Sequence, residues 1–218
     1  MVQLITFEGG DGSGKTTQMK RLEGYLTSKG KSCLLTHEPG GTELGRWIRK
    51  VIVDGGSGDV ANEMELFLYL ADRAQHIHEV IRPAMEERKI VLCDRFTDST
   101  LAYQGYGRGF DPELLQRMNQ LASGGLQPDL TLLLDCAPET ALYRARRRTE
   151  EQSPGGSPGD RFESQNLEFH ERVRGGFLEI ARAEPKRIVV LDSSAPAEKV
   201  HEKIKKIVDE RLGGLSTE

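Results

Sequence analysis

The sequence predicts an α/β fold in which a five-stranded parallel sheet is flanked by helices on both faces. Short apolar runs rich in Val, Ile and Leu recur along the chain, and helical patterns separate them. The runs show little strict alternation of polar and apolar residues, which is typical of strands buried on both faces. Strands that alternate with helices pair in parallel through right-handed crossovers. The predicted strands span residues 2–7, 32–36, 89–94, 130–135 and 187–192.

The predicted helices lie between and after these strands. Residues 15–29 place their apolar side chains on one face, and Gly30 ends the pattern. A longer pattern covers residues 61–87, where we expect Pro83 to kink the last turns. A proline suits the first helical turn, so a third helix is predicted over residues 138–148. The last two predicted helices are residues 167–183 and 197–212.

Length and composition favour one soluble domain over residues 1–218, with 37% hydrophobic and 29% charged residues. The net charge of −4 argues against a dedicated nucleic-acid or membrane-surface binder. No basic segment precedes a long apolar run, and no stretch approaches the ~18 apolar residues of a membrane helix. We therefore expect a cytoplasmic protein. Its three cysteines include no CxxC pair, which favours free thiols over a disulfide framework or zinc site.

The strongest motif is GGDGSGKT at residues 9–16, a complete match to GxxxxGK[ST] between a predicted strand and a predicted helix. Its glycines permit positive φ, so successive N–H groups can point at phosphate oxygens near a helix N-terminus. We expect Lys15 to reach the β- and γ-phosphates of ATP and Thr16 to bind Mg²⁺. The predicted phosphate-binding residues are Gly9, Gly10, Asp11, Gly12, Ser13, Gly14, Lys15, Thr16 and Thr17.

Asp94 and Asp135 each end a predicted strand. Asp94 lies at the carboxyl end of a strand next to the phosphate loop, where an acid that helps to hold magnesium is expected. Arg95, the next residue, is suited to bind a substrate phosphate. We therefore predict Thr16 and Asp94 as the metal-binding pair. Asp135 has two interpretations, a similar acid or a negative charge at the N-terminus of the next helix.

A cluster of arginines indicates a lid over approximately residues 144–162. Arg144 begins the run RARRR, and Arg161 follows a stretch over residues 150–160 that is rich in glycine and proline. Four arginines in five positions cannot share one helix face. A hinged segment with guanidinium groups at both ends is typical of a lid that stabilises a transferring phosphoryl group.

Further features favour a kinase with a phosphate acceptor. The guanine-recognition pattern NKxD is absent from the sequence, and no H-R-D-like general base occurs. A phosphate acceptor needs no such base, because its second pKa is about 6 and its oxygen is already anionic. Alignment and charge neutralisation then supply the catalysis.

At this point the chain resembles the bacterial thymidylate kinases, from Gly9 to about Val208. The shared motifs are FEGGDGSGKTT at 7–17, EPGGT at 38–42, ADRAQH at 71–76, DRFTDSTLAYQG at 94–105, PDLTLLLD at 128–135, RARRR at 144–148 and DRFE at 160–163. The resemblance implies the P-loop nucleoside monophosphate kinase fold, usually a homodimer. It also implies transfer of the γ-phosphoryl group of ATP·Mg to dTMP in dTTP biosynthesis.

The resemblance implies roles for the acceptor-site residues. Asp11 would contact the sugar or phosphate region of dTMP, and Arg95 would bind the phosphate with help from Arg49. Tyr69 and Arg73 are four positions apart and share a helix face. Tyr69 would stack on thymine, and Arg73 would bond its carbonyl. The remaining implied substrate residues are Glu38 in a substrate-facing turn, Thr100 and Gln104 at the base edge, and Tyr103 near the sugar 2′ position.

The resemblance also assigns the donor side. The phosphate loop from Gly9 to Lys15 contains no arginine, and its position 13 is Ser13. In this family, a phosphate loop without an arginine accompanies a lid rich in basic residues. Arg144 and Arg161 would contact ATP and the transferring phosphoryl group, and residues 192–195 resemble an adenine-side loop. The implied catalytic residues are Lys15, Arg95, Arg144, Arg161 and Asp11.

Several alternatives stay open from the sequence. Tyr69 and Tyr103 also fit core or helix-face packing, and Arg73 also fits a surface ion pair with Glu65 or Asp72. The acceptor could be another nucleoside monophosphate, or the 5′-hydroxyl of a deoxynucleoside if a carboxylate deprotonates it. A nucleotide-dependent switch without catalysis is the alternative from a different class.

Overall fold

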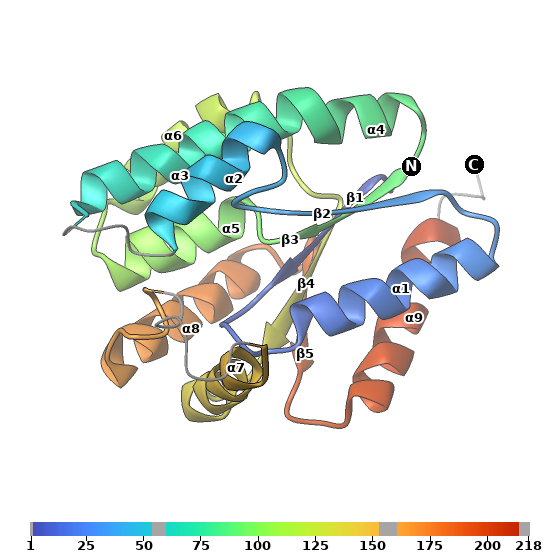
Figure 1. The fold of residues 1–218 in the computed structure, drawn as a ribbon. Helices are drawn as coiled ribbons and strands as arrows, with labels where there is room; N and C mark the ends of the chain where they lie inside the picture. Colours follow the sequence, from blue (N-terminus) through green and yellow to red (C-terminus); the bar gives the residue numbers. More distant parts are fainter. Residues whose placement is uncertain (1, 54–59, 153–160, 214–218) are drawn as a thin grey trace.

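The computed structural model describes residues 2–53, 60–152 and 161–213. Its five strands form one parallel sheet in the order β2-β3-β1-β4-β5, which confirms the predicted fold class. Figure 1 shows helices on both sides of this sheet. The strands are β1 (Leu4–Glu8), β2 (Cys33–His37), β3 (Ile90–Asp94), β4 (Leu130–Asp135) and β5 (Ile188–Asp192), all close to their predicted positions.

Most of the predicted helices are also present. Their bounds are α1 (Lys15–Ser28), α3 (Asn62–His76), α4 (Arg82–Glu86), α7 (Pro138–Gln152), α8 (Leu167–Ala183) and α9 (Ala197–Gly213). A π-helical turn, η1 (Ile77–Ile81), joins α3 to α4. Pro83 therefore perturbs the turn that precedes it, because proline lacks an N–H donor and its ring crowds the preceding backbone.

The periodicity analysis missed the helices on either side of the acceptor region. These are α2 (Glu43–Ile52), α5 (Thr97–Thr100), the π-helical η2 (Leu101–Gly107) and α6 (Pro112–Ser123). α2 and α6 do carry apolar residues at helical spacing, such as Leu44, Ile48 and Ile52 in α2, and each of these two helices also has a side-chain cap. Thr42 Oγ1 accepts from Gly45 N at 2.8 Å to cap α2, and Asp111 Oδ1 accepts from Leu114 N at 2.8 Å to cap α6.

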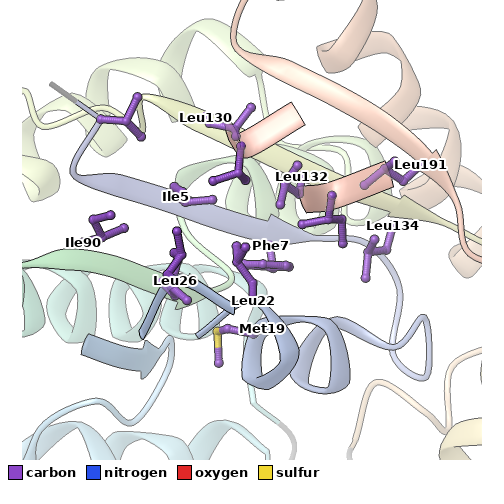
Figure 2. Packing of buried hydrophobic residues seen from close by; sticks show 14 of the residues in the cluster. Ile5, Phe7, Met19, Leu22, Leu26, Ile90, Leu130, Leu132, Leu134 and Leu191 are labelled. Carbon is purple, nitrogen blue, oxygen red and sulfur yellow. The ribbon is translucent and has the colours of Figure 1, made fainter. Parts of the chain in front are cut away.

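The sheet buries different residues on its two faces. Ile5 and Phe7 of β1 face α1 and α9, where they pack with Leu22, as Figure 2 shows. Leu4 points to the opposite face and packs against Ile81 of η1. Burying such side chains contributes about 1.5–3 kcal/mol each. These two cores fix β1 at the sheet centre, so the loop that follows it lies at the carboxyl edge, where parallel sheets bind ligands.

Cys33, Cys93 and Cys136 are all free thiols. Within the part of the chain that the structure describes, we find no helix that combines the length and apolar character of a membrane span.

Candidate active site

The loop between β1 and α1 has the backbone of a phosphate cradle. Gly9, Gly12 and Gly14 adopt φ values of 131°, 82° and 96°, a region that favours glycine. The loop leads into the N-terminus of α1, whose first N–H groups have no partner within the helix. The buried Lys15 Nζ donates to Gly9 O at 3.0 Å and to Gly10 O at 2.9 Å. Its ammonium group therefore lies across the mouth of the cradle.

This loop packs tightly against the helix that carries the arginine run. A Cβ atom on Gly12 would lie 2.0 Å from the carbonyl oxygen of Ala141 in α7. That separation is far below van der Waals contact, so only glycine fits here. The phosphate loop and the start of α7 therefore form one packed unit.

The predicted magnesium residues lie beside the cradle. Thr16 Oγ1 donates to Asp94 Oδ2 at 2.9 Å, which brings a hydroxyl and a carboxylate to one point. Hard oxygen donors of this kind suit Mg²⁺, which usually binds one or two protein oxygens together with phosphates and waters. Among the described residues there is no cluster of three or more His, Cys, Asp or Glu side chains able to hold a metal.

Asp135 has a different role from Asp94. It forms a bidentate ion pair with Arg174 of α8, with Asp135 Oδ1 to Arg174 Nε at 2.7 Å and Asp135 Oδ2 to Arg174 Nη2 at 2.8 Å. Both carboxylate oxygens of Asp135 therefore bind Arg174. This makes Asp135 less suitable than Asp94 as a magnesium ligand.

Arg95 links the phosphate cradle to a second pocket. Its Nη2 donates to Asp11 Oδ1 at 2.6 Å and to Tyr103 Oη at 3.1 Å, and Tyr103 Oη donates to Asp11 Oδ2 at 3.2 Å. Burial alone would raise the pKa of Asp11, but the charges of Arg95 and Lys15 outweigh burial and hold the pKa well below its usual range. The cluster therefore combines one firmly ionised carboxylate with two cations.

Glu8, a buried carboxylate that was not predicted as a site residue, helps to hold Arg95 in place through Ser99. Glu8 Oε1 accepts from Phe96 N at 2.7 Å, and Glu8 Oε2 accepts from Ser99 Oγ at 2.6 Å. Arg95 Nη1 in turn donates to the same Ser99 Oγ at 3.1 Å. Burial, reinforced by the nearby Asp98, raises the pKa of Glu8 to about 7. Glu8 thus caps α5 and fixes the left-handed turn at Arg95, where φ is 69°.

The second pocket gathers every side chain that we predicted for acceptor binding. These are Asp11, Glu38, Arg49, Tyr69, Arg73, Arg95, Thr100, Tyr103 and Gln104, and the other lining residues are Pro39, Val53, Ser99 and Phe162. They come from the loop after β1, the turn after β2, and α2, α3, α5 and η2, which are distant in sequence.

Arg73 is buried in this pocket, so the surface ion-pair alternative was wrong. Its side chain is 2% exposed, and its Nε donates to Glu38 Oε2 at 2.8 Å. Nη1 donates to Thr100 Oγ1 at 2.9 Å and to Asn119 Oδ1 at 2.6 Å, and Nη2 donates to Phe96 O at 2.9 Å. A guanidinium group has five N–H donors. The N–H that these contacts do not use is on Nη2.

The pocket aromatics both line the cavity and pack. The ring centroid of Tyr69 is 6.4 Å from that of Phe162, and Tyr103 is 5.4 Å from the same ring in an edge-on arrangement. The packing alternatives for Tyr69 and Tyr103 therefore hold alongside the pocket positions. Phe162 lies in the DRFE motif, but its part in the pocket could not be read from sequence.

The two predicted lid arginines lie on opposite sides of the site. Arg144 donates to Ser193 O at 3.1 Å and lines a cleft of about 320 Å³ beside the phosphate loop. Arg161 forms an ion pair with the buried Glu65 of α3, near the acceptor pocket. The structure does not bring these two side chains together, and most of the predicted hinge, residues 153–160, falls outside the described residues.

A larger cleft, of about 680 Å³, contains none of the predicted site residues. It lies between α6 and the starts of β4 and β5. The charged side chains of Arg187, Asp98 and Glu184 in this cleft bind one another, and Arg187 also donates to Thr131. Size alone therefore does not make this cleft the reactive site.

Comparison with known proteins agrees with this geometry. A family model described as thymidylate kinase matches residues 7–204. The chain belongs to the thymidylate kinase family. It is 52% identical to the thymidylate kinase of Desulfovibrio desulfuricans over 197 residues, covering 90% of each chain. It is 49% identical to that of Maridesulfovibrio salexigens over 211 residues, covering 97% of each.

Solved structures give the same answer for the fold. The crystal structure of thymidylate kinase from Ehrlichia chaffeensis superimposes with a TM-score of 0.75 at 33% sequence identity. The match covers 95% of this chain and 98% of the other. The family resemblance predicted from ordered motifs is therefore confirmed over nearly the whole chain.

Proposed function

We propose that this chain is an ATP:dTMP phosphotransferase, which transfers the γ-phosphoryl group of ATP to dTMP and yields ADP and dTDP for dTTP biosynthesis. The observation that carries the proposal is the junction at Arg95. This residue lines the acceptor pocket and bonds Asp11 of the phosphate loop, so donor and acceptor phosphates would meet there. Membership of the thymidylate kinase family supports the identity of both substrates.

ATP would occupy the phosphate loop and the cleft beside it. The loop amides and Lys15 would hold the β- and γ-phosphates. The neighbouring cleft is lined by Arg144, Ser193, Ser194 and Ala195, which supports adenine binding on that side. We assign this chain one kinase domain with a lid at approximately residues 144–162, from which Arg144 and Arg161 would contact ATP and the transferring group.

The acceptor would bind with its phosphate at Arg95 and its base toward Arg73. Arg49 lines the same pocket and is held by Pro39 O at 3.1 Å from its Nη1. The base would stack on Tyr69, and Tyr103 would lie near the sugar. An acceptor phosphate oxygen is anionic at neutral pH, so attack needs alignment and cationic stabilisation rather than a base.

The contacts of two nearby carboxylates disfavour the competing acceptor, a 5′-hydroxyl, which would need a carboxylate as its base. Glu8 is fully buried and its oxygens are occupied by Phe96 N and Ser99. Asp11 is held in an ion pair with Arg95. These contacts favour a monophosphate acceptor over a nucleoside.

Magnesium fits the paired oxygens of Thr16 and Asp94. When bound there with ATP, the ion would neutralise phosphate charge and orient the β- and γ-phosphates.

We also propose a homodimer formed through α2 and α3. Trp47 of α2 and Phe67 of α3 are 63% and 58% exposed, and Val51 and Met64 are also exposed on these helices. Exposed apolar side chains gathered on two neighbouring helices are typical of a protein interface. The free thiols of the three cysteines support a reducing, cytoplasmic location.

A coupled ADP-release assay with ATP·Mg tests the proposal. The acceptors would be dTMP, dUMP, dCMP, dGMP, GMP and thymidine, each in a separate reaction. We expect the highest kcat/KM with dTMP. Turnover with thymidine but not dTMP would reassign the chain to a nucleoside kinase, and ATP hydrolysis that ignores every acceptor would indicate a switch.

A further inference from the structure

Glu65 is a buried carboxylate next to the acceptor pocket that takes no part in the proposed function. It is 0% exposed and lies in the first turn of α3. Its Oε1 accepts from Gln104 Nε2 at 2.9 Å and from Arg108 Nε at 3.3 Å. Its Oε2 accepts from Arg108 Nη2 at 3.1 Å and from Arg161 Nη2. One acid therefore connects a pocket residue to two guanidinium groups.

This arrangement fixes which end of the Gln104 amide faces the pocket. A carboxylate between two guanidinium groups offers only acceptors, so Gln104 must turn its NH₂ group toward Glu65. Gln104 also lines the acceptor pocket. The group left for a ligand is therefore the carbonyl Oε1, which is an acceptor.

Arg73 supplies the complementary donor to the same pocket. The two residues together offer one N–H donor and one carbonyl acceptor. Thymine presents a carbonyl at position 4 and an N–H at position 3, which match this pair. Cytosine presents an amino donor at position 4 and an unprotonated nitrogen at position 3, so both contacts would be mismatched.

We propose that Glu65 is a positioning residue for base specificity, which holds the Gln104 amide so that the site accepts 4-keto pyrimidines and rejects 4-amino pyrimidines. The proposal deepens the proposed function and rests on it. Glu65 touches no substrate and acts through Gln104. Its carboxylate decides the donor and acceptor pattern that the base meets.

Glu65→Gln is the direct test, because it keeps the shape and changes the pattern. The new amide has one oxygen, and this oxygen would face Arg108 and Arg161, since an N–H opposite two cations is the worse mismatch. Its NH₂ group would then face Gln104, whose amide would turn and put an N–H into the pocket. We expect the kcat/KM ratio of dTMP to dCMP to fall by about tenfold to a hundredfold.

Arg108→Gln is the matched control. It breaks the same ion pair with Glu65 but leaves a carboxylate facing Gln104. We expect this variant to lose thermal stability and to keep the dTMP to dCMP ratio within about threefold of wild type. If Arg108→Gln lowers the ratio as much as Glu65→Gln, the ion pair and not the amide direction sets specificity, and the proposal is wrong.

Gln104→Glu tests the same idea without altering Glu65. A protonated carboxyl group would donate its O–H to Glu65 and keep its carbonyl acceptor facing the pocket, so the preference for dTMP should persist, whereas Gln104→Leu should lose it. Loss of preference in both variants would overturn the proposal, as would a folded Glu65→Gln protein with the wild-type ratio. Failure of the proposed function looks different, because wild type itself would then show no dTMP-dependent turnover.

Discussion

The Nε atom of Arg73 donates to Glu38 Oε2 across 2.8 Å, and both side chains are almost fully removed from solvent. The pair joins α3 to the turn after β2, and His76 Nδ1 lies 2.9 Å from the other oxygen of Glu38. The residue proposed to recognise the base is therefore held by the fold before any ligand arrives. A rigid guanidinium with one remaining donor would select a carbonyl with little further ordering.

Replacing Arg73 with alanine is expected to raise KM for dTMP at least about tenfold, with KM for ATP nearly unchanged. The variant should also be less stable by about 3 kcal/mol, because Glu38 keeps a buried charge without its partner. Steady-state kinetics and urea unfolding measure the two effects. Arg73→Lys is the matched control, which keeps the charge but loses the planar fork. Equal changes in both KM values would mean that Arg73 is only structural.

Replacing Lys15 with alanine is expected to lower kcat by about a thousandfold or more, through lost stabilisation of the transferring phosphoryl group. The fold should survive, since the hydrogen bonds of Lys15 within the described part of the chain go to the loop carbonyls of Gly9 and Gly10. Single-turnover kinetics alongside circular dichroism separates chemistry from folding. A variant that turns over at the wild-type rate would remove Lys15 from the mechanism.

Stability should depend on pH through Glu8. Its pKa rises from 4.5 to about 7 on folding, so the folded state binds the proton more tightly. The stabilisation is complete below about pH 4.5 and is lost as pH rises through about 7, by about 3 kcal/mol in total. Urea unfolding at pH 5 and pH 7.5 should show this fall in wild type and a smaller one in Glu8→Gln. Equal falls in both proteins would contradict the role of Glu8.

The magnesium pair can be tested by titrating the metal. Asp94→Asn removes the charge next to Thr16 Oγ1, and the Mg²⁺ concentration for half-maximal rate should rise about tenfold or more. Chelation with EDTA should abolish turnover in wild type. Asp135→Asn serves as the control, because its carboxylate pairs with Arg174 and not with Thr16. If only Asp135→Asn raised the Mg²⁺ concentration for half-maximal rate, Asp135 and not Asp94 would be the magnesium ligand.

The proposed dimer face can be tested with one charge. Phe67→Glu places a carboxylate in the exposed apolar patch of α2 and α3, and burying it against a partner would be unfavourable. Light scattering after size exclusion should report a dimer for wild type and a monomer for the variant. Tyr143→Glu is a suitable control, since Tyr143 is similarly exposed on α7. A monomeric wild type would refute the homodimer.

Sequence patterns predicted the strands and the phosphate loop because these depend on local order. An apolar run identifies a buried strand wherever it pairs, and a glycine motif carries its own backbone geometry. Thr16 and Asp94 were placed together because parallel strands end at one edge of a sheet. The family resemblance supplied the acceptor residues, which the structure gathers into one pocket.

The supporting contacts could not be predicted, since they depend on how helices cross. Asn119 reaches Arg73 from α6, 46 positions away, and nothing in its local sequence marks it. Glu65 resembled an ordinary acid in the first turn of a helix. Glu8 is the last residue of a strand, a position where many acids are exposed, and the segment that follows Arg95 buries it here.

The glycine at position 12 has a consequence for how this enzyme could change over generations. The helix that bears the arginine run fills the volume that any side chain at position 12 would need. The atoms in the way belong to the backbone of Ala141 and Ala145, so no choice of rotamer could relieve the clash. A larger residue at position 12 could therefore be accepted only if α7 moved first, whereas Gly10 in the same loop has open space around it. Variation in the loop is thus restricted position by position, according to how closely α7 approaches.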